Sequence, residues 1–229
     1  MKLFSALFIA FLTFISTALS QEASQLPKAL IIGDSISIAY TKPVTQALEG
    51  KILVKRVPGN AQYTGTGLQK IDEWLGTEKW DVIHFNWGLW DMYGWEFDAE
   101  DRSPETYAKR LDTLVTRLEK TGAKLIWATT TPACPDPEKT MQKRFQKAVI
   151  IDPAREKQYL VAAETVMKAH NVQINDLHAL IAPHLEKYAL GRNDVHFNNE
   201  CSLLLAQQVA QKIAEALKVV PNPIPAPAK

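Results

Sequence analysis

The sequence has few cysteines, no excess of charge of either sign, and no long apolar run beyond its first twenty residues. Its two cysteines, Cys134 and Cys201, lack the paired spacing of a zinc site. Because Lys2 is the only charged residue before position 21, the 26 basic residues of the full chain become 25 in residues 21–229, against 25 acidic ones. A neutral chain gives no electrostatic reason to expect nucleic acid or an anionic membrane as a partner. No apolar segment after residue 20 is long enough to span a bilayer. No glycine-rich phosphate loop is present, and we predict neither a metal site nor a cofactor.

The first twenty residues have the pattern of a cleaved signal peptide. Lys2 precedes an uncharged, apolar stretch over residues 3–19, and Ala18-Leu19-Ser20 has the small-x-small form of a signal-peptidase site. An uncleaved membrane anchor is the alternative, and the short stretch with its small-residue exit favours cleavage after Ser20. We therefore expect an exported protein, periplasmic or extracellular, with a signal peptide over 1–20 and one domain over 21–220. The proline-rich tail over 221–229 can form neither helix nor sheet, and we expect it to be solvated.

Strand and helix patterns alternate through residues 21–220. Buried strands are predicted over 28–32, 51–57, 80–86, 123–129 and 172–174, and helices over 36–48, 67–75, 104–121, 155–170, 177–188 and 199–219. This alternation predicts parallel strands joined by right-handed crossovers. The expected fold is an α/β/α sandwich of three layers around a flavodoxin-like, parallel five-stranded sheet. Ligands of such sheets bind at the carboxyl ends of the strands.

Four short motifs lie just beyond strand ends or near the C-terminus. They are Gly33-Asp34-Ser35, Asn60-Ala61-Gln62-Tyr63-Thr64-Gly65, Asn86-Trp87-Gly88-Leu89-Trp90-Asp91 and Asn193-Asp194-Val195-His196. The first three follow predicted strands, so they should converge at one edge of the sheet. A serine needs a base to become a nucleophile, and His196 can supply one. Helix capping by Asp34 and Ser35 is the alternative reading of the first motif.

In their order and spacing the four motifs resemble those of the SGNH hydrolases, the GDSL-type esterases, over nearly all of the chain after residue 20. The resemblance implies acyl transfer with Ser35 as nucleophile and His196 as base. It also implies that the backbone N–H groups of Ser35 and Gly65 bind the oxyanion, because Gly65 lies five residues after Asn60. Gly59 and Gly67 are rivals of Gly65 for this role.

The chain departs from the family pattern at two places. The family's aspartate lies three residues before the histidine, where this chain has Asn193, while Asp194 lies two residues before His196. We favour Asp194 as the partner of His196, with Asn193 as the alternative. The family's third motif is Gly-x-Asn-Asp, whereas this chain has Trp90 at the asparagine position. The third oxyanion donor is then expected to be the Asn86 amide or the Trp90 indole N–H.

Aromatic residues are dense after the third predicted strand. Trp87, Trp90 and Tyr93, with Trp95 and Phe97 beyond them, are predicted to contact a carbohydrate, with core packing as the alternative. With the expected export, they favour a serine esterase that removes acetyl groups from a carbohydrate. The expected partner is thus a small-molecule or polysaccharide ester.

Two alternative functions and one structural expectation remain open. The first alternative is a lipid or small-acyl ester hydrolase, and the second is a non-catalytic carbohydrate-binding protein on the same scaffold. A disulfide between Cys134 and Cys201 is also predicted, because both lie at the same expected edge of the sheet.

Overall fold

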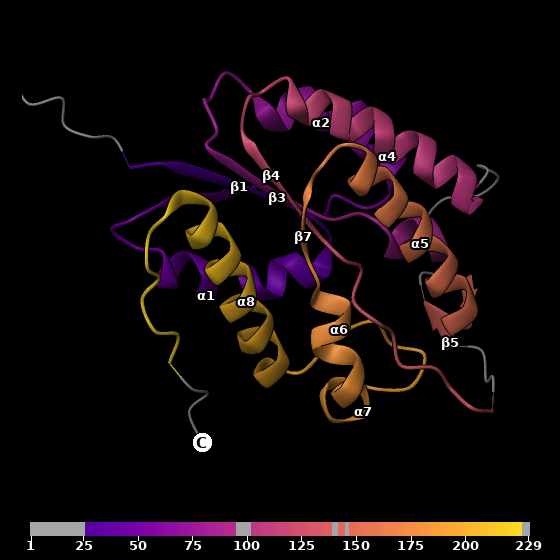
Figure 1. Ribbon diagram of the computed structural model, residues 1–229. Coiled ribbons are helices and arrows are strands. Elements are labelled where there is room, and N and C mark those ends of the chain that lie inside the picture. Colours follow the sequence, from indigo (N-terminus) through magenta and orange to yellow (C-terminus); the bar gives the residue numbers. More distant parts are fainter. Residues whose placement is uncertain (1–25, 95–101, 139–141, 145–146, 226–229) are drawn as a thin grey trace, which may run out of the picture.

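A computed structural model describes residues 26–94, 102–138, 142–144 and 147–225. Its centre is a sheet of five parallel strands, shown in Figure 1. The strands are β1 (Lys28–Ile32), β2 (Leu53–Arg56), β3 (Val82–Phe85), β4 (Lys124–Ala128) and β7 (Gln173–Asn175), in the order β2-β1-β3-β4-β7. All four residues of β3 are buried, as expected for a strand covered on both faces. The predicted parallel five-stranded sheet is therefore confirmed.

Helices cover both faces of this sheet. On one face lie α1 (Ser35–Ala47) and α8 (Asn199–Leu217), which pack against each other, and on the other lie α2 (Thr64–Leu75), α4 (Pro104–Glu119) and α5 (Pro153–Ala169) (Figure 1). Helix α4 shows why these segments fold locally. The Ser103 hydroxyl caps its N-terminus by accepting from Thr106 N–H, and Pro104 occupies its first turn. Its buried residues, Tyr107, Leu111, Leu114, Val115 and Leu118, form one apolar face.

Some elements differ from those predicted. The structure adds a short helix α3 (Leu89–Tyr93) inside the third motif and a hairpin of β5 (Gln142–Arg144) and β6 (Lys147–Val149). The single helix expected over 177–188 is divided into α6 (Leu177–Ile181), a 3₁₀ turn (Ala182–His184) and α7 (Leu185–Tyr188). Pro183 lies in that turn, and it cannot donate the backbone hydrogen bond that a continuous helix needs.

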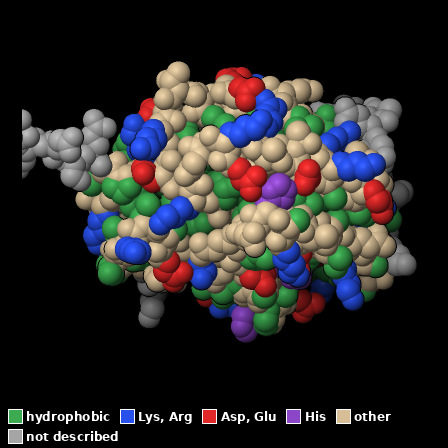
Figure 2. Space-filling view, turned by 45° about the horizontal axis from the view of Figure 1, so that its top comes forward, with side chains coloured by type: hydrophobic (Ala, Val, Ile, Leu, Met, Phe, Trp, Pro, Cys, Tyr) green, Lys and Arg blue, Asp and Glu red, His purple; other side chains and the backbone are tan. Residues whose placement is uncertain are grey.

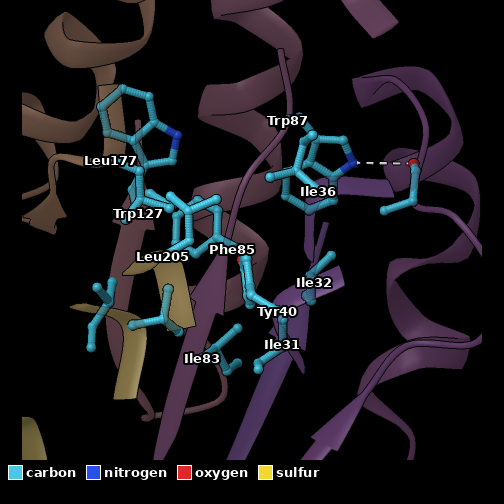
Figure 3. Packing of buried hydrophobic residues seen from close by; sticks show 14 of the residues in the cluster. Ile31, Ile32, Ile36, Tyr40, Ile83, Phe85, Trp87, Trp127, Leu177 and Leu205 are labelled. Atoms are coloured by element: carbon cyan, nitrogen blue, oxygen red, sulfur yellow. Dashed lines mark hydrogen bonds between the residues drawn. The ribbon is translucent and has the colours of Figure 1, made fainter. Parts of the chain in front are cut away.

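The hydrophobic core lies between the sheet and its helices, and Figure 3 shows part of it. Trp87 and Trp127 are the largest side chains that are almost fully buried. The Trp87 indole N–H donates to the Ala61 carbonyl at 3.3 Å, the bond dashed in Figure 3. Trp87 is therefore a core residue with its one polar atom satisfied.

The first part of the proline-rich tail is docked on the domain, contrary to the expectation of a solvated tail. Asn222 donates its backbone N–H to the Ala47 carbonyl at 2.6 Å and its side-chain amide to the Glu49 carbonyl at 3.2 Å. Lys51 Nζ donates to Asn222 Oδ1 at 2.6 Å, and Ile224 packs against the core. These contacts give hydrogen-bond donors to the backbone carbonyls of Ala47 and Glu49 at the C-terminal end of α1. They join segments that are far apart in the chain, so local sequence patterns could not reveal them.

The charged side chains of the surface are mixed. Figure 2 shows Lys and Arg interspersed with Asp and Glu on the face in view. None of the helices within the described ranges has the length and hydropathy needed to cross a membrane. The predicted signal peptide, residues 1–20, lies outside the described residues.

Candidate active site

Ser35 lies at the first position of α1, directly after the turn that follows β1. Asp34 is the N-cap, and its Oδ1 accepts the Ile36 N–H at 2.9 Å. Burial raises the pKa of the Asp34 carboxyl, and the hydrogen bond from Ile36 N–H and the nearby charge of Arg56 oppose that rise. The cap leaves Ser35 half-buried at the N-terminus of a helix, where peptide dipoles favour a negative charge.

Ser35, His196 and Asp194 form a hydrogen-bonded chain. Ser35 Oγ lies 2.9 Å from His196 Nε2, and His196 Nδ1 lies 2.9 Å from Asp194 Oδ1. The same Asp194 oxygen accepts the backbone N–H of His196 at 2.9 Å. A carboxylate on Nδ1 selects the tautomer with its proton there, so Nε2 is left to accept the Ser35 hydroxyl.

The structure places Asp194, and not Asn193, beside the imidazole. Asn193 has a φ of 53°, a left-handed conformation, and its side chain is buried. Its Oδ1 accepts the Ile151 N–H at 3.2 Å, while its backbone N–H donates to the Cys134 carbonyl at 2.7 Å. The left-handed residue thus turns the chain so that the next side chain, Asp194, reaches His196.

The second motif brings Gly65 into the first turn of α2. The N-cap residue Tyr63 offers no side-chain cap, and the buried Asp91 carboxylate takes that role by accepting Thr64 N–H at 3.1 Å and the Thr64 hydroxyl. A Cβ on Gly65 would come within 2.4 Å of the Tyr63 ring, so packing requires a glycine there. Burial raises the pKa of Asp91 to about 7, opposed by the Thr64 hydrogen bonds.

Comparisons with known proteins agree with this fold. Neither a protein-family model nor a curated sequence matches the chain. Solved structures do match: a lipase/acylhydrolase from Enterococcus faecalis has a TM-score of 0.67 at 20% identity, covering 86% of this chain and 100% of its own. An acetyl xylan esterase gives 0.63 at 16% identity, covering 81% and 99% respectively. The chain has the SGNH hydrolase fold. An acetylxylan esterase from Geobacillus stearothermophilus shares this fold, with a TM-score of 0.62 at 19% identity over 82% of this chain and 94% of its own.

The third motif of this SGNH fold does not place Asn86 as a free donor. Asn86 Nδ2 donates to the Ala128 carbonyl at 2.8 Å and to Thr130 Oγ1 at 3.2 Å. Both amide hydrogens are therefore used in holding the end of β3 to the end of β4, which corrects the expectation that Asn86 supplies the third oxyanion donor. Trp90 lies in α3, where 5% of its surface is exposed.

The aromatic cluster is mostly core, so the expected substrate contacts of Trp87, Tyr93 and Trp90, the last 5% exposed, are corrected. Trp87 is 1% exposed and Tyr93 is 7% exposed. The Tyr93 hydroxyl donates to Glu156 Oε1 at 3.1 Å, which anchors α3 to α5. A ring can stack on a sugar only through an exposed face, which none of these residues presents. Trp95 and Phe97 lie outside the described residues.

The two cysteines are buried free thiols, and the predicted disulfide is wrong. Cys134 pairs through its backbone with Asp194, in an isolated antiparallel bridge. Cys201 lies in the first turn of α8 and is fully buried, and burial raises the pKa of its thiol to about 12. The loop that carries His196 is therefore held by backbone hydrogen bonds to residue 134, in the place where a disulfide was expected.

Two residues near the candidate site were missed by the sequence patterns. Glu156 is buried on α5 and accepts from the Tyr93 hydroxyl and, at 3.2 Å, from Ala133 N–H. Burial raises its pKa to about 7. Arg56 ends β2 and lies beside the turn that leads to Ser35. A charged residue at the end of an edge strand is common, so the sequence alone does not single out Arg56. Its position becomes informative only once β2 is paired with β1, which places Arg56 level with Ile31. Within the described ranges, no cluster of three or more His, Cys, Asp or Glu side chains could hold a metal ion.

Proposed function

We propose that this protein is a serine esterase that transfers the acyl group of an ester first to Ser35 and then to water. The observation that carries the proposal is the continuous chain from Ser35 Oγ through His196 to Asp194, with 2.9 Å at each step. Nucleophile, base and orienting carboxylate are already within hydrogen-bonding distance. This arrangement favours catalysis over the alternative of a non-catalytic binding protein.

The chemistry follows from these positions. Ser35 Oγ attacks the ester carbonyl carbon while His196 Nε2 takes the hydroxyl proton, and Asp194 stabilises the resulting imidazolium. The carbonyl oxygen becomes an oxyanion, for which the Ser35 and Gly65 backbone N–H groups are the donors. The C–O bond to the alcohol then breaks, and the alcohol leaves with the proton from His196. Water repeats the sequence on the acyl-enzyme and releases the carboxylic acid.

Within this class we propose an acetyl ester of a carbohydrate as substrate, and export as the setting. Two of the similar solved structures are of acetyl xylan esterases, which supports a carbohydrate substrate. The leader-like residues 1–20 support export. Because Trp87 and Tyr93 are buried, the proposal does not depend on stacking by these rings. Ester hydrolysis of lipids or small acyl groups is an outcome of the test.

The deciding experiment compares acyl chain length and alcohol on one preparation. Purified protein is assayed on 4-nitrophenyl acetate, butyrate and octanoate, and for acetate release from acetylated xylan, with Ser35→Ala as the inactive control. Acetate release that depends on Ser35 supports the proposal. A preference for octanoate indicates a lipid esterase, and no turnover together with retained carbohydrate binding indicates a binding protein.

Mass spectrometry of the secreted protein should find Gln21 at its N-terminus.

A further inference from the structure

Arg56 donates hydrogen bonds to the turn that leads from β1 to Ser35, residues 33–35, which we call the nucleophile turn. It is the last residue of β2, level in register with Ile31 of β1, and therefore lies at the carboxyl edge of the sheet beside the turn that leads to Ser35. Its guanidinium has five N–H groups in a rigid plane. Nη2 donates to the Gly33 carbonyl at 2.8 Å and to the Asp34 carbonyl at 3.3 Å. Two successive carbonyls of the nucleophile turn thus share one donor group.

The remaining donors of Arg56 reach the loop that precedes the second motif, and α1. Nη1 donates to the Val57 carbonyl at 2.8 Å and to the Gly59 carbonyl at 2.6 Å, and Nε donates to Ser37 Oγ at 3.1 Å. All five N–H groups are therefore used. Its hydrogen bonds go to carbonyl and hydroxyl oxygens, and its charge also acts on the nearby Asp34 carboxyl, whose pKa it lowers. Arg56 thereby reinforces a direct bond between the two loops, in which Ala61 N–H donates to the Gly33 carbonyl at 3.1 Å.

The contact with Asp34 acts directly on an oxyanion donor. The carbonyl of Asp34 and the N–H of Ser35 belong to one trans peptide, in which they point in opposite directions. Fixing and polarising this oxygen therefore fixes the direction of the Ser35 N–H and strengthens it as a donor. Ser37 Oγ, itself held by Arg56, donates to the same oxygen at 2.7 Å. On the other side, residues 57 and 59 lead into the loop that ends at Gly65.

We propose that Arg56 is a positioning residue that sets the two backbone donors of the oxyanion site, at Ser35 and Gly65, relative to each other. This inference rests on the proposed esterase function. A residue with this role contributes to the transition state and little to substrate binding, so its loss lowers kcat and leaves KM nearly unchanged. A misplacement of about 1 Å at such a site costs about 100-fold in rate.

The test uses Arg56→Lys and Arg56→Ala, with Arg117→Ala as the matched control. Arg117 also donates to a backbone carbonyl, that of Leu68, at 2.8 Å and pairs with Asp72, but it bridges α2 and α4 away from Ser35. Three quantities are measured for each: kcat and KM on 4-nitrophenyl acetate, the rate at which a 4-nitrophenyl phosphonate labels Ser35, and the thermal midpoint.

We expect Arg56→Lys to lower kcat and the phosphonylation rate by about 10- to 100-fold with KM within about twofold. Arg117→Ala should lower the thermal midpoint and leave kcat as in the wild type. Guanidinium ions should partly restore the rate of Arg56→Ala, and if that variant does not fold, Arg56→Lys decides. Wild-type rates in folded Arg56→Lys would overturn the inference and leave the esterase proposal intact. A wild-type protein that is neither active nor labelled would overturn the esterase proposal, and the inference with it.

Discussion

Removal of the Asp194 carboxylate should slow turnover far more than removal of the neighbouring Asn193 side chain. In Asp194→Ala, His196 loses the acceptor of its Nδ1–H, which fixes both the tautomer and the ring orientation. Loss of such a carboxylate costs about 10⁴-fold in other triads. Here the Asp194 and His196 side chains are 27% and 29% exposed, so water can partly solvate the imidazolium in the variant. We therefore expect a fall in kcat of about 10³- to 10⁴-fold, or about 4–5 kcal/mol of barrier.

Two further variants separate charge from geometry. Asp194→Asn keeps an oxygen that can accept both the His196 backbone N–H and Nδ1–H but lacks the negative charge, so its kcat should fall nearly as far as that of Asp194→Ala if the charge is what matters. Asn193→Gly is the control, because glycine accepts the φ of 53° and keeps the backbone bond to Cys134, while the side-chain bond to Ile151 N–H is lost. That loss should cost about 1–3 kcal/mol of stability and leave kcat within a few-fold.

The assay is steady-state hydrolysis of 4-nitrophenyl acetate, with the folded fraction of each variant established by circular dichroism. Ser35→Ala gives the background rate. If Asn193→Gly loses as much activity as Asp194→Ala, the assignment of Asp194 as the carboxylate partner of His196 is refuted. The ring would then be oriented by the neutral amide.

Three other changes should show distinct signatures. Asp91→Asn should flatten the decline in unfolding free energy between about pH 4 and pH 7, measured by urea titration at each pH. In that window the native Asp91, with its pKa raised to about 7, keeps a proton that the unfolded chain, near 3.8, has released, so stability falls as pH rises. An unchanged slope would contradict this. Trp87→Ala should lower the unfolding free energy by about 3–5 kcal/mol, because the indole is buried in the core; an effect confined to KM would return Trp87 to the substrate site. Deleting residues 221–229 removes the Asn222 hydrogen bonds and should lower stability by about 1–3 kcal/mol in thermal melts, whereas an unaltered midpoint would mean that the docked tail adds nothing.

Several parts of the site could be predicted from sequence because their causes are local. Alternating apolar strands and amphipathic helices fix the order of elements, and a parallel sheet then brings the ends of its strands to one edge. Ser35 follows β1 by three residues, so its place at that edge needs no further information. His196 has an acidic residue two positions before it, and it is the histidine whose surrounding motif matches the family pattern near the C-terminus.

The remaining features depend on contacts between segments far apart in the chain. Asp194 rather than Asn193 meets His196 because Asn193 adopts a left-handed turn and residues 193 and 194 pair with Cys134. The amide of Asn86 is occupied because β4 lies beside β3 and presents the Ala128 carbonyl. Arg56 reaches the nucleophile turn only because β2 pairs with β1. Sequence determined which residues arrive at the carboxyl edge of the sheet, whereas tertiary packing decided which of their polar atoms are already bonded to other parts of the chain.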